Sequence, residues 1–576
     1  MRTQPQAHAL KDEKTWPFFL DAIVLGAVIA VVYLMVVVGR YWFGAIVPAA
    51  TISRSPWAIP MYTVFSLVRM TAAYLLSLVF AVAYGYIAAY NKRLQAPMLA
   101  TLDILQSIPV LSFLPGVMLA MVSLFPTRQL GVEIGSVILI FTGQVWNMAF
   151  SFYASLRAIP KELREASRIY RFNRLQQFLQ LELPYGTIGL VWNSMVSVAG
   201  GWFFLMACEM FVLGKRDFRL PGLGSYLQSA ASDGDTRGIL YGLTAMIAVI
   251  VLIDQLVWRP AIAWADKFKM EQVESSGASE SPILSFLQNS PLLTRLITKT
   301  LDPWSERLYL YAAAHHHEHS FHMREARRGR LLRWIASGLV VGLILFAVVQ
   351  AFLTLRSVTS TEFLTTVQSA GATFLRVLIA LVLGSAWTIP VGVAIGFSPK
   401  LARIAQPLAQ IAASVPATAL FPVVLLALVS VGGGLKVGSV MLMLLGTQWY
   451  ILFNVIAGAM AIPSEFREVS DIFRFSRLDR WRTVILPGIF PYLLTGLVTA
   501  SGGAWNASIV AEYFHFKGKV LSTFGLGSLI SSATDAGNFS LLLLSTVVMA
   551  TLVVTVNRLL WRPLYRVAER RYRLEQ

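Results

Sequence analysis

Long apolar stretches constrain this chain more than any other feature of its sequence. Twelve of them reach the roughly 20 residues that a helix needs to cross the hydrocarbon core of a bilayer. They lie near residues 18–39, 62–90, 98–125, 132–156, 187–213 and 238–258, and again near 331–355, 363–397, 400–431, 435–460, 488–514 and 538–558. Helices satisfy every backbone group inside lipid, so we expect an all-α polytopic membrane protein.

The composition supports this class. Apolar residues make up 56% of the 576 residues and charged residues only 14%, against about 25% charged residues in a soluble protein. The net charge of +18 would suggest nucleic acid as the partner of a soluble protein. Here we expect the basic residues in cytoplasmic loops and no nucleic-acid partner. The single cysteine, Cys208, excludes an intrachain disulfide and argues against redox chemistry.

The basic loops predict the orientation. The segment before the first stretch is polar and lacks a small-residue cleavage site, so we expect a retained helix and a cytoplasmic amino terminus. Two short loops are then cytoplasmic, in agreement with the positive-inside rule. Their basic residues are Arg157, Lys161, Arg164, Arg168, Arg171 and Arg174 in one loop and Arg467, Arg474, Arg477, Arg480 and Arg482 in the other. The basic residues Lys215, Arg216 and Arg219 run against the pattern.

The sequence contains an internal duplication. Residues 159–184 align with 462–487 at an offset of 303, and 13 of these 26 pairs are identical. The same offset pairs Trp202 with Trp505 and Glu209 with Glu512, whereas an offset of 307 pairs Arg69 with Arg376. Because each copy has an even number of spans, the copies run parallel, which suits a transport path between two like bundles.

The duplication predicts the domain organisation. We expect a cytoplasmic amino terminus (1–17), a first transmembrane domain (18–260), a cytoplasmic linker (261–330), a second transmembrane domain (331–563) and a cytoplasmic tail (564–576). The linker contains a histidine-rich tract, His315 to His322, which looks like a metal-binding segment. We expect it to be a solvated basic or weakly metal-chelating segment and not a regulatory site, and we assign no metal site.

A polar loop of about 26 residues joins the fourth and fifth stretches in each copy. Loops tolerate change, so the retained similarity predicts that this loop contacts a partner. Pro160 and Pro463 suit the first turn of a helix. The apolar residues that follow Pro160 at helical spacing are Leu163, Ala166, Ile169 and Tyr170. We therefore predict a short amphipathic helix in each loop, with a membrane-parallel helix held by lipid headgroups as the alternative.

These loops resemble the cytoplasmic loop of ABC importer permeases, which reads Glu-Ala-Ala, three residues, Gly, nine residues, then Ile-x-Leu-Pro. The first copy has Glu165-Ala166-Ser167 and ends with Leu183-Pro184, and the second has Glu468-Val469-Ser470 and ends with Leu486-Pro487. Both copies replace the family's glycine with arginine, at Arg171 and Arg474. Within importers, the chain is similar to the nitrate/sulfonate/bicarbonate (taurine-type) permeases. The residues behind this similarity are Phe374-Leu375-Arg376, Trp202, Glu209, Trp505, Glu512, Gly222-Leu223-Gly224 and Gly525-Leu526-Gly527.

The resemblance implies two tandem six-helix permease domains of a type I ABC importer in a bacterial inner membrane. It implies two cytoplasmic ABC ATPase subunits, which bind ATP and Mg²⁺, and an extracytoplasmic solute-binding protein, with no cofactor bound by this chain. The implied solute is a small anion such as nitrate, a sulfonate (taurine) or bicarbonate. The residues implied to couple the loops to the ATPases are Glu162, Arg164, Glu165, Ala166, Ser167 and Arg171, and Glu465, Arg467, Glu468, Ser470 and Arg474.

Charged residues inside the spans are candidates for the translocation path or its gate. Arg69 and Arg376 lie about two turns inside their spans, where an unpaired charge costs several kcal/mol. Glu209 and Glu512 end the fifth span at a compatible depth, so we expect each arginine to share its charge with one of them. The pairs form either an outer gate or a structural ion pair.

Tryptophans and prolines in the spans have two interpretations each. Trp202 and Trp505 lie seven residues before the two glutamates, on the same helical face, and either line the path or fill packing. The third span in each copy is expected to break at its serine and prolines, which exposes backbone groups at a site or serves packing alone. These residues are Ser107, Pro109 and Pro115, and Ser414, Pro416 and Pro422.

Two other function classes compete with an importer permease. An ion-coupled secondary transporter also uses six-helix repeats, but it predicts intramembrane relays of Asp, Glu or His. A membrane scaffold that recruits enzymes through the basic loops would leave the duplicated Trp and Glu of the fifth span without a role. The sequence lacks a Gly-x-x-x-x-Gly-Lys-[Ser/Thr] loop, so we expect no enzyme activity and ATP hydrolysis in separate subunits.

Overall fold

The computed structural model describes residues 52–126, 129–213, 216–268, 349–430, 434–516 and 519–571, with a few isolated positions between 285 and 346. The described residues belong to two compact units. One takes in residues 154–192 and 252–322, and the other residues 44–153, 193–251 and 323–576. The predicted span 18–39, most of the predicted span 331–355, most of the linker and the His315–His322 tract lie outside the described residues.

The helices occur in the same order in both copies. The first copy contains α2 (Ile59–Tyr90), α3 (Lys92–Ser107), α4 (Val110–Leu124), α5 (Leu130–Ala158), α6 (Lys161–Ile169), α7 (Arg174–Gln177), α8 (Leu183–Glu209), α9 (Leu223–Asp233), α10 (Thr236–Ile253) and α11 (Arg259–Ala265). The second contains α16 (Ser360–Phe397), α17 (Pro399–Ser414), α18 (Ala417–Ser430), α19 (Leu435–Met460), α20 (Ser464–Ile472), α21 (Arg477–Arg480), α22 (Leu486–Ala511), α23 (Leu526–Ala536), α24 (Phe539–Val556) and α25 (Arg562–Arg571). This order confirms the duplication.

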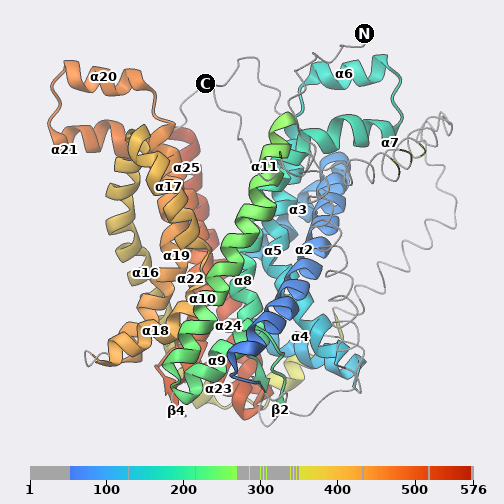
Figure 1. Cartoon of the computed structure of the whole chain (residues 1–576), viewed down its shortest axis with the longest axis vertical. Coiled ribbons are helices and arrows are strands. Elements are labelled where there is room, and N and C mark those ends of the chain that lie inside the picture. Colours follow the sequence, from blue (N-terminus) through green and yellow to red (C-terminus); the bar gives the residue numbers. More distant parts are fainter. Residues whose placement is uncertain are drawn as a thin grey trace, which may run out of the picture. The chain divides into compact units, whose positions relative to one another are not determined.

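A two-stranded antiparallel hairpin follows the fifth span in each copy. Strand β1 (Val212–Leu213) pairs with β2 (Arg216–Asp217), and β3 (Tyr513–Phe516) pairs with β4 (Lys519–Ser522). In the second copy, α22 connects the loop helix α20 at one end to this hairpin at the other (Figure 1). At about 1.5 Å per residue, the 26 residues of α22 separate these ends by about 39 Å.

The described residues include eight helices that are long and apolar enough to cross a membrane. They run over Pro56–Tyr90, Leu130–Ala158, Arg174–Glu209, Thr236–Ala265, Ser360–Phe397, Leu435–Met460, Arg477–Ala511 and Phe539–Ala568. These helices confirm the predicted fold class: the chain is an all-α polytopic membrane protein.

The third span is bent in the second copy and interrupted in the first. Helices α17 and α18 meet at 87°, and α3 and α4 are separated by Ile108 and Pro109. The breaks fall at Pro109 and Pro416 because proline disfavours helical geometry in the residue before it. The prediction that Pro115 and Pro422 also break the span is wrong, since both lie within continuous helices.

Small residues let the second span pack closely. The buried residues Ala73, Ser77, Ala81 and Gly85 recur every four positions along α2 and so form one ridge. A Cβ at Gly85 would lie 3.0 Å from Phe152 Cδ1 on α5, and a Cβ at its counterpart Gly392 would lie 2.7 Å from Val455 Cγ1 on α19. Close backbone approach therefore sets the distance between the second and fourth spans in both copies.

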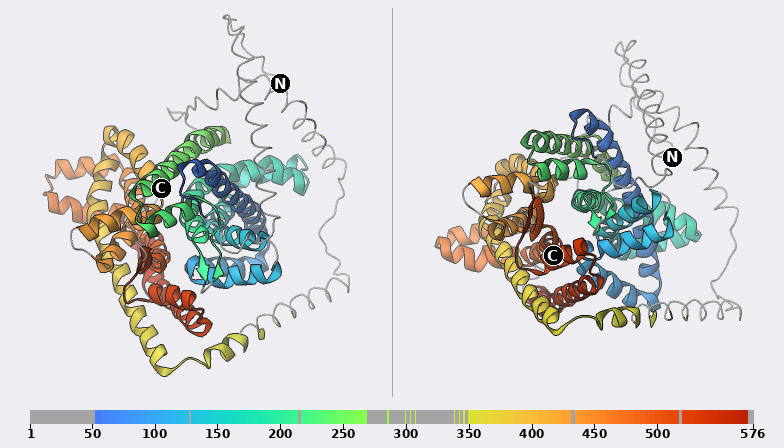
Figure 2. Two further views of the ribbon diagram at one scale, coloured as in Figure 1. Left: turned by 60° about the horizontal axis from the view of Figure 1, so that its bottom comes forward. Right: turned by 90° about the horizontal axis from the view of Figure 1, so that it is seen from below.

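Helices of the two copies also pack against one another within the larger unit. Helix α24 contacts α3 and α4, and α22 and α23 contact α4. Figure 2 shows these red helices of the second copy beside the blue helices of the first in both views. Thr546 Oγ1 of α24 donates a hydrogen bond to the carbonyl of Ser112 in α4 at 3.0 Å. The described part of the second copy therefore packs directly on the first.

We expect Gly85→Leu and Gly392→Leu to lower the thermal midpoint of the purified chain, because neither site has room for a side chain. The matched control is Gly371→Leu in α16, where a Cβ would meet nothing within 4 Å. Fluorescence-detected size-exclusion chromatography after heating measures the midpoints. Equal midpoints for the three variants would contradict the packing argument.

Candidate functional site

A buried charge cluster joins three elements at the end of the fifth span in the first copy. Arg69 of α2 donates a hydrogen bond from Nη1 to Glu209 Oε1 at 2.9 Å, and Ser66 Oγ donates to the same oxygen at 2.6 Å. The other oxygen of Glu209 accepts the backbone N–H of Gly224 at 2.7 Å, in the first turn of α9. A carboxylate at a helix amino terminus satisfies unpaired N–H groups and complements the helix dipole.

The second copy repeats this arrangement. Arg376 Nη1 donates to Glu512 Oε1 at 2.7 Å, and Thr373 Oγ1 takes the place of the serine hydroxyl at 2.9 Å. Glu512 Oε2 accepts the N–H of Gly527 in α23 at 2.9 Å. The predicted pairing of each arginine with a glutamate of the fifth span is therefore confirmed in both copies.

The two clusters differ in one carboxylate. Arg69 also makes a two-bond contact with Glu133 of α5, from Nε to Oε2 at 2.6 Å and from Nη2 to Oε1 at 2.7 Å. The offset of 303 pairs Glu133 with Lys436, whose side chain is exposed. Arg376 instead donates from Nη2 to Thr523 Oγ1 at 3.0 Å. In the first cluster one arginine thus pairs with two carboxylates, and in the second cluster one arginine pairs with one carboxylate.

Glycine is required beside each glutamate. A Cβ at Gly222 or Gly525 would overlap the carboxylate of Glu209 or Glu512. The Gly-Leu-Gly sequences after the fifth span therefore have two roles. The first glycine leaves room for the carboxylate, and the second donates its N–H to it.

The candidate path residues lie in the interior of the larger unit. Arg69, Glu209 and Glu512 are fully buried, and Trp202 and Trp505 are each 1% exposed. Trp505 stacks on Phe374, with ring centroids 6.3 Å apart and planes at 20°. These contacts favour packing and structural ion pairing over the lining of an open path, and a role in gating stays a prediction.

The loop helices end in a specific backbone turn. After α6, Phe172 donates its N–H to the Ser167 carbonyl and Arg171 donates to the Arg168 carbonyl, at 2.9 and 3.0 Å. These two bonds define a Schellman motif, which places one residue in the left-handed region and favours glycine there. Arg171 occupies that position with φ of 52°.

The second loop makes the same turn. Phe475 donates to the Ser470 carbonyl at 2.9 Å and Arg474, with φ of 49°, to the Asp471 carbonyl at 3.1 Å. Both copies thus make the same left-handed turn, although a left-handed residue other than glycine costs about 1–2 kcal/mol. Pro160 and Pro463 were predicted to lie in the first turn of their helices. The structure places each of them one residue earlier, as the N-cap.

The loop helices expose apolar side chains at their ends. Ile169 and Tyr170 are 79% and 75% exposed, and Ile472 and Phe473 are 75% and 71% exposed. The described residues of the two loop helices that are buried are Ser167 and Ser470. The candidate coupling residues with exposed side chains are Glu162, Glu165 and Arg171, and Glu465, Glu468 and Arg474.

Arg164 anchors the first loop helix. Its Nη2 donates to the carbonyl of Leu156 in α5 at 2.6 Å, and Ser167 Oγ donates to the Arg164 carbonyl at 2.8 Å. Ala166 is partly buried, and the side chain of Arg467 lies outside the described residues. In the second loop, Asp471 of α20 pairs with Arg480. Each loop helix is thus held in place by polar contacts rather than by a buried apolar face.

Comparison with known families agrees with this geometry. A family model described as the binding-protein-dependent transport system inner membrane component matches twice, at residues 81–257 and 388–574. The chain belongs to this family. It is therefore a multi-pass inner-membrane permease with two tandem copies of the family domain.

Several curated permeases are similar to this chain. The nitrate import permease protein NrtB of Leptolyngbya laminosa is 27% identical over 188 residues, which are 33% of this chain and 64% of that protein. The taurine transport system permease protein TauC of Escherichia coli is 29% identical over 168 residues (29% and 58%). The bicarbonate transport system permease protein CmpB of Synechococcus elongatus is 26% identical over 170 residues (30% and 58%). The alignments span less than two thirds of each relative.

Sequence reasoning missed several cluster residues, among them Ser66, Thr373, Glu133 and Thr523. Ser66 and Thr373 lie three residues before the arginines, at helical spacing, and the offset of 307 pairs them, so the duplication held the signal. Glu133 has no acidic counterpart, and a search for repeated residues overlooks it. An acidic residue within a membrane helix was itself a sufficient signal.

We expect Arg69→Gln to lower the thermal midpoint of the permease more than Arg376→Gln. The first change leaves two buried carboxylates without this arginine, and the second leaves one. Removing one partner of a buried pair costs about 3–5 kcal/mol. Glu133→Gln is the control, because it leaves Arg69 paired with Glu209 and gives the first cluster the charge composition of the second, so we expect a smaller loss than in Arg69→Gln. A larger loss in Arg376→Gln than in Arg69→Gln would contradict this account.

If Arg376 and Glu512 only formed an ion pair, exchanging the two charges with Arg376→Glu and Glu512→Arg together would restore the stability lost in the single variants. We expect no recovery, because an arginine at 512 cannot accept the N–H of Gly527 and would clash at Gly525. The same thermal assay measures the double variant against both single variants. Recovery to the wild-type midpoint would show that the helix-capping contact contributes little.

Proposed function

We propose that this permease supplies both membrane domains of an ATP-driven importer, which moves a small solute by alternating access. Its partners are two cytoplasmic ABC ATPase subunits and an extracytoplasmic solute-binding protein, and its amino terminus is cytoplasmic. ATP and Mg²⁺ bind to the ATPases and not to this chain. The observation that carries the proposal is the duplicated loop helix with exposed apolar residues at its end.

The loop geometry supports transmission of force. A short helix fixed by a Schellman turn moves as a unit, so displacement by a partner passes to the span that follows. Apolar side chains more than 70% exposed at a loop tip suit burial in a groove of another protein. The two loops differ in charge, since Arg168 corresponds to Asp471, so each presents its own surface to an ATPase.

The solute is proposed from the relatives, which are permeases named for nitrate, taurine and bicarbonate. A small anion of this group is the proposed cargo. The buried clusters at Glu209 and Glu512 tie the second span, the fifth span and the helix after it together. We place the outer gate at this end and assign the clusters the role of keeping its helices together as it moves.

We expect Glu165→Lys together with Glu468→Lys to uncouple ATP hydrolysis from transport. Both side chains are exposed, so the fold has little reason to change. Uptake into proteoliposomes that contain the assembled importer should fall at least about tenfold, as loss of two charged interface contacts implies. The control is Asp233→Lys, which breaks only an exposed ion pair with Arg54. Normal uptake with unchanged ATPase co-purification would rule out this role.

The two left-handed arginines allow a sharper test. Replacing both Arg171 and Arg474 by glycine removes backbone strain and should keep or raise the thermal midpoint. If the guanidinium groups contact the ATPases, the same variant co-purifies less ATPase than the wild type. The control Arg171→Lys with Arg474→Lys keeps both charge and strain. Undiminished ATPase binding in the glycine variant would remove these arginines from the interface.

A further inference from the structure

A cavity of about 390 Å³ lies where the two copies meet inside the larger unit. The first copy lines it from α4, α9, β1 and the end of α8, and the second copy lines it from α22, α23 and β3. It lies at the end of α22 opposite the α20 loop. With α20 facing the cytoplasm, the cavity is on the extracytoplasmic side.

Much of the cavity wall is apolar. The apolar residues on it include Leu111, Leu114, Phe211, Ile509, Phe514 and Ile530. An inorganic anion of four heavy atoms displaces about as much volume as two waters, or about 60 Å³. The cavity is several times larger, and its apolar wall offers such an anion no hydrogen bonds. Its size falls in the range of sites that bind organic molecules.

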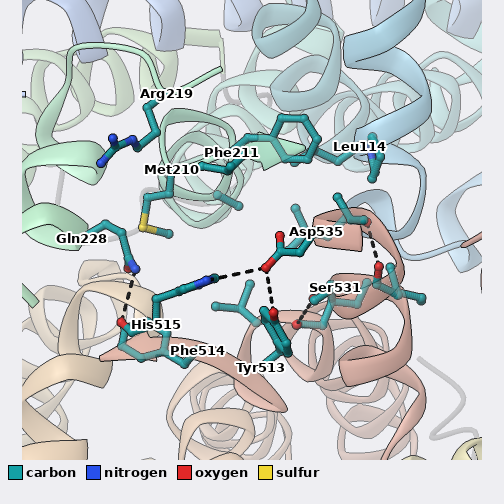
Figure 3. Close-up of a pocket in the computed structure, with 18 of the residues that line it drawn as sticks. Leu114, Met210, Phe211, Arg219, Gln228, Tyr513, Phe514, His515, Ser531 and Asp535 are labelled. Atoms are coloured by element: carbon teal, nitrogen blue, oxygen red, sulfur yellow. Dashed lines mark hydrogen bonds and ion pairs between the residues drawn. The ribbon is translucent and has the colours of Figure 1, made fainter. Parts of the chain in front are cut away.

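The polar side of the cavity comes mainly from the second copy (Figure 3). Tyr513 donates its hydroxyl proton to Asp535 Oδ2 at 2.7 Å, and His515 Nε2 lies 3.5 Å from the same oxygen. Burial and the hydrogen bond to Asp535 raise the pKa of Tyr513 above its ordinary value, so the phenol stays protonated and donates at neutral pH. Both of these contacts use Oδ2, and Oδ1 of this 31% exposed side chain has no partner among the described residues.

The first copy lacks this polar group. At the offset of 303, Tyr513, His515 and Asp535 correspond to Met210, Val212 and Ser232, which line the same cavity. The first copy contributes Arg219 and Gln228 instead, and Figure 3 shows Arg219 across the cavity from Asp535. The cavity therefore has a carboxylate on one side, a guanidinium on the other and apolar surface between them.

We propose that this cavity binds a zwitterionic organic solute, with an amino group at Asp535, an acidic group toward Arg219 and a short hydrocarbon segment between them. A bare inorganic anion fits less well, because Asp535 repels it and the wall leaves it partly unsolvated. This inference rests on the proposed function. Among the small anions proposed there as solutes, it selects organic acids that carry an amino group.

The test is isothermal titration calorimetry on the purified full-length permease in nanodiscs. The probes are 2-aminoethanesulfonate, 2-hydroxyethanesulfonate, which lacks the amino group, and nitrate. We expect saturable binding of the aminosulfonate, with at least about tenfold weaker binding of the other two, because a charge-assisted hydrogen bond is lost. Asp535→Asn should weaken aminosulfonate binding by a similar factor, and it should not weaken nitrate binding, because it removes the charge that repels the anion.

The matched control is Asp233→Asn, which removes a carboxylate in α9 outside the cavity lining and should leave binding unchanged. Ser232→Trp fills the cavity from the first copy and should abolish binding, which keeps the proposal testable if Asp535→Asn fails to fold. Absence of saturable aminosulfonate binding, equal binding of nitrate, or equal affinities in all folded variants would overturn the proposal. If the proposal is overturned in this way, ATP-driven nitrate uptake by the wild-type importer would leave the proposed function standing. If instead the proposed function is wrong, the importer shows no ATP-driven uptake although the aminosulfonate still binds to the permease.

Discussion

A buried carboxylate at the end of the fifth span holds the ends of several elements together in each copy. Glu209 and Glu512 accept hydrogen bonds from an arginine and a hydroxyl of the second span and from the amino terminus of the next helix. Burying a carboxylate is costly unless every oxygen is satisfied. The position of the following glycine, the hydroxyl and the arginine all follow from that requirement.

The two copies have corresponding clusters and corresponding loops, which differ at particular positions. Glu133 adds a second carboxylate to one cluster, whereas Lys436 occupies the equivalent position in the other copy and is exposed. The cavity shows the same divergence, since Tyr513, His515 and Asp535 have apolar or small counterparts. A fused chain can specialise each half, because the halves are always present in a one-to-one ratio.

In the cytoplasmic loops, the residue type at the turn does not by itself predict the backbone conformation. Both loops have arginine where the resembling pattern has glycine, yet the backbone there is left-handed, at φ of 52° and 49°. Two hydrogen bonds and a buried serine determine the turn, and the strain of a left-handed arginine is small beside them. The identity of one residue was therefore a weaker guide to the backbone turn than the hydrogen bonds around that residue.

The sequence alone determined the membrane class, the two copies, the loop helices and the pairing of each intramembrane arginine with a glutamate of the fifth span. Each follows from a local pattern: apolar length, a constant offset, helical spacing, or the cost of an unpaired charge in lipid. Only the tertiary structure showed that Glu133 shares Arg69, that Gly222 makes room for a carboxylate, and that the third span bends at Pro416 but not at Pro422. Likewise, the cavity at Asp535 depends on residues from α4, α9 and α23, which are far apart in the chain. Such contacts are decided by how helices pack, and no local pattern in the sequence records the distance between side chains that packing brings together.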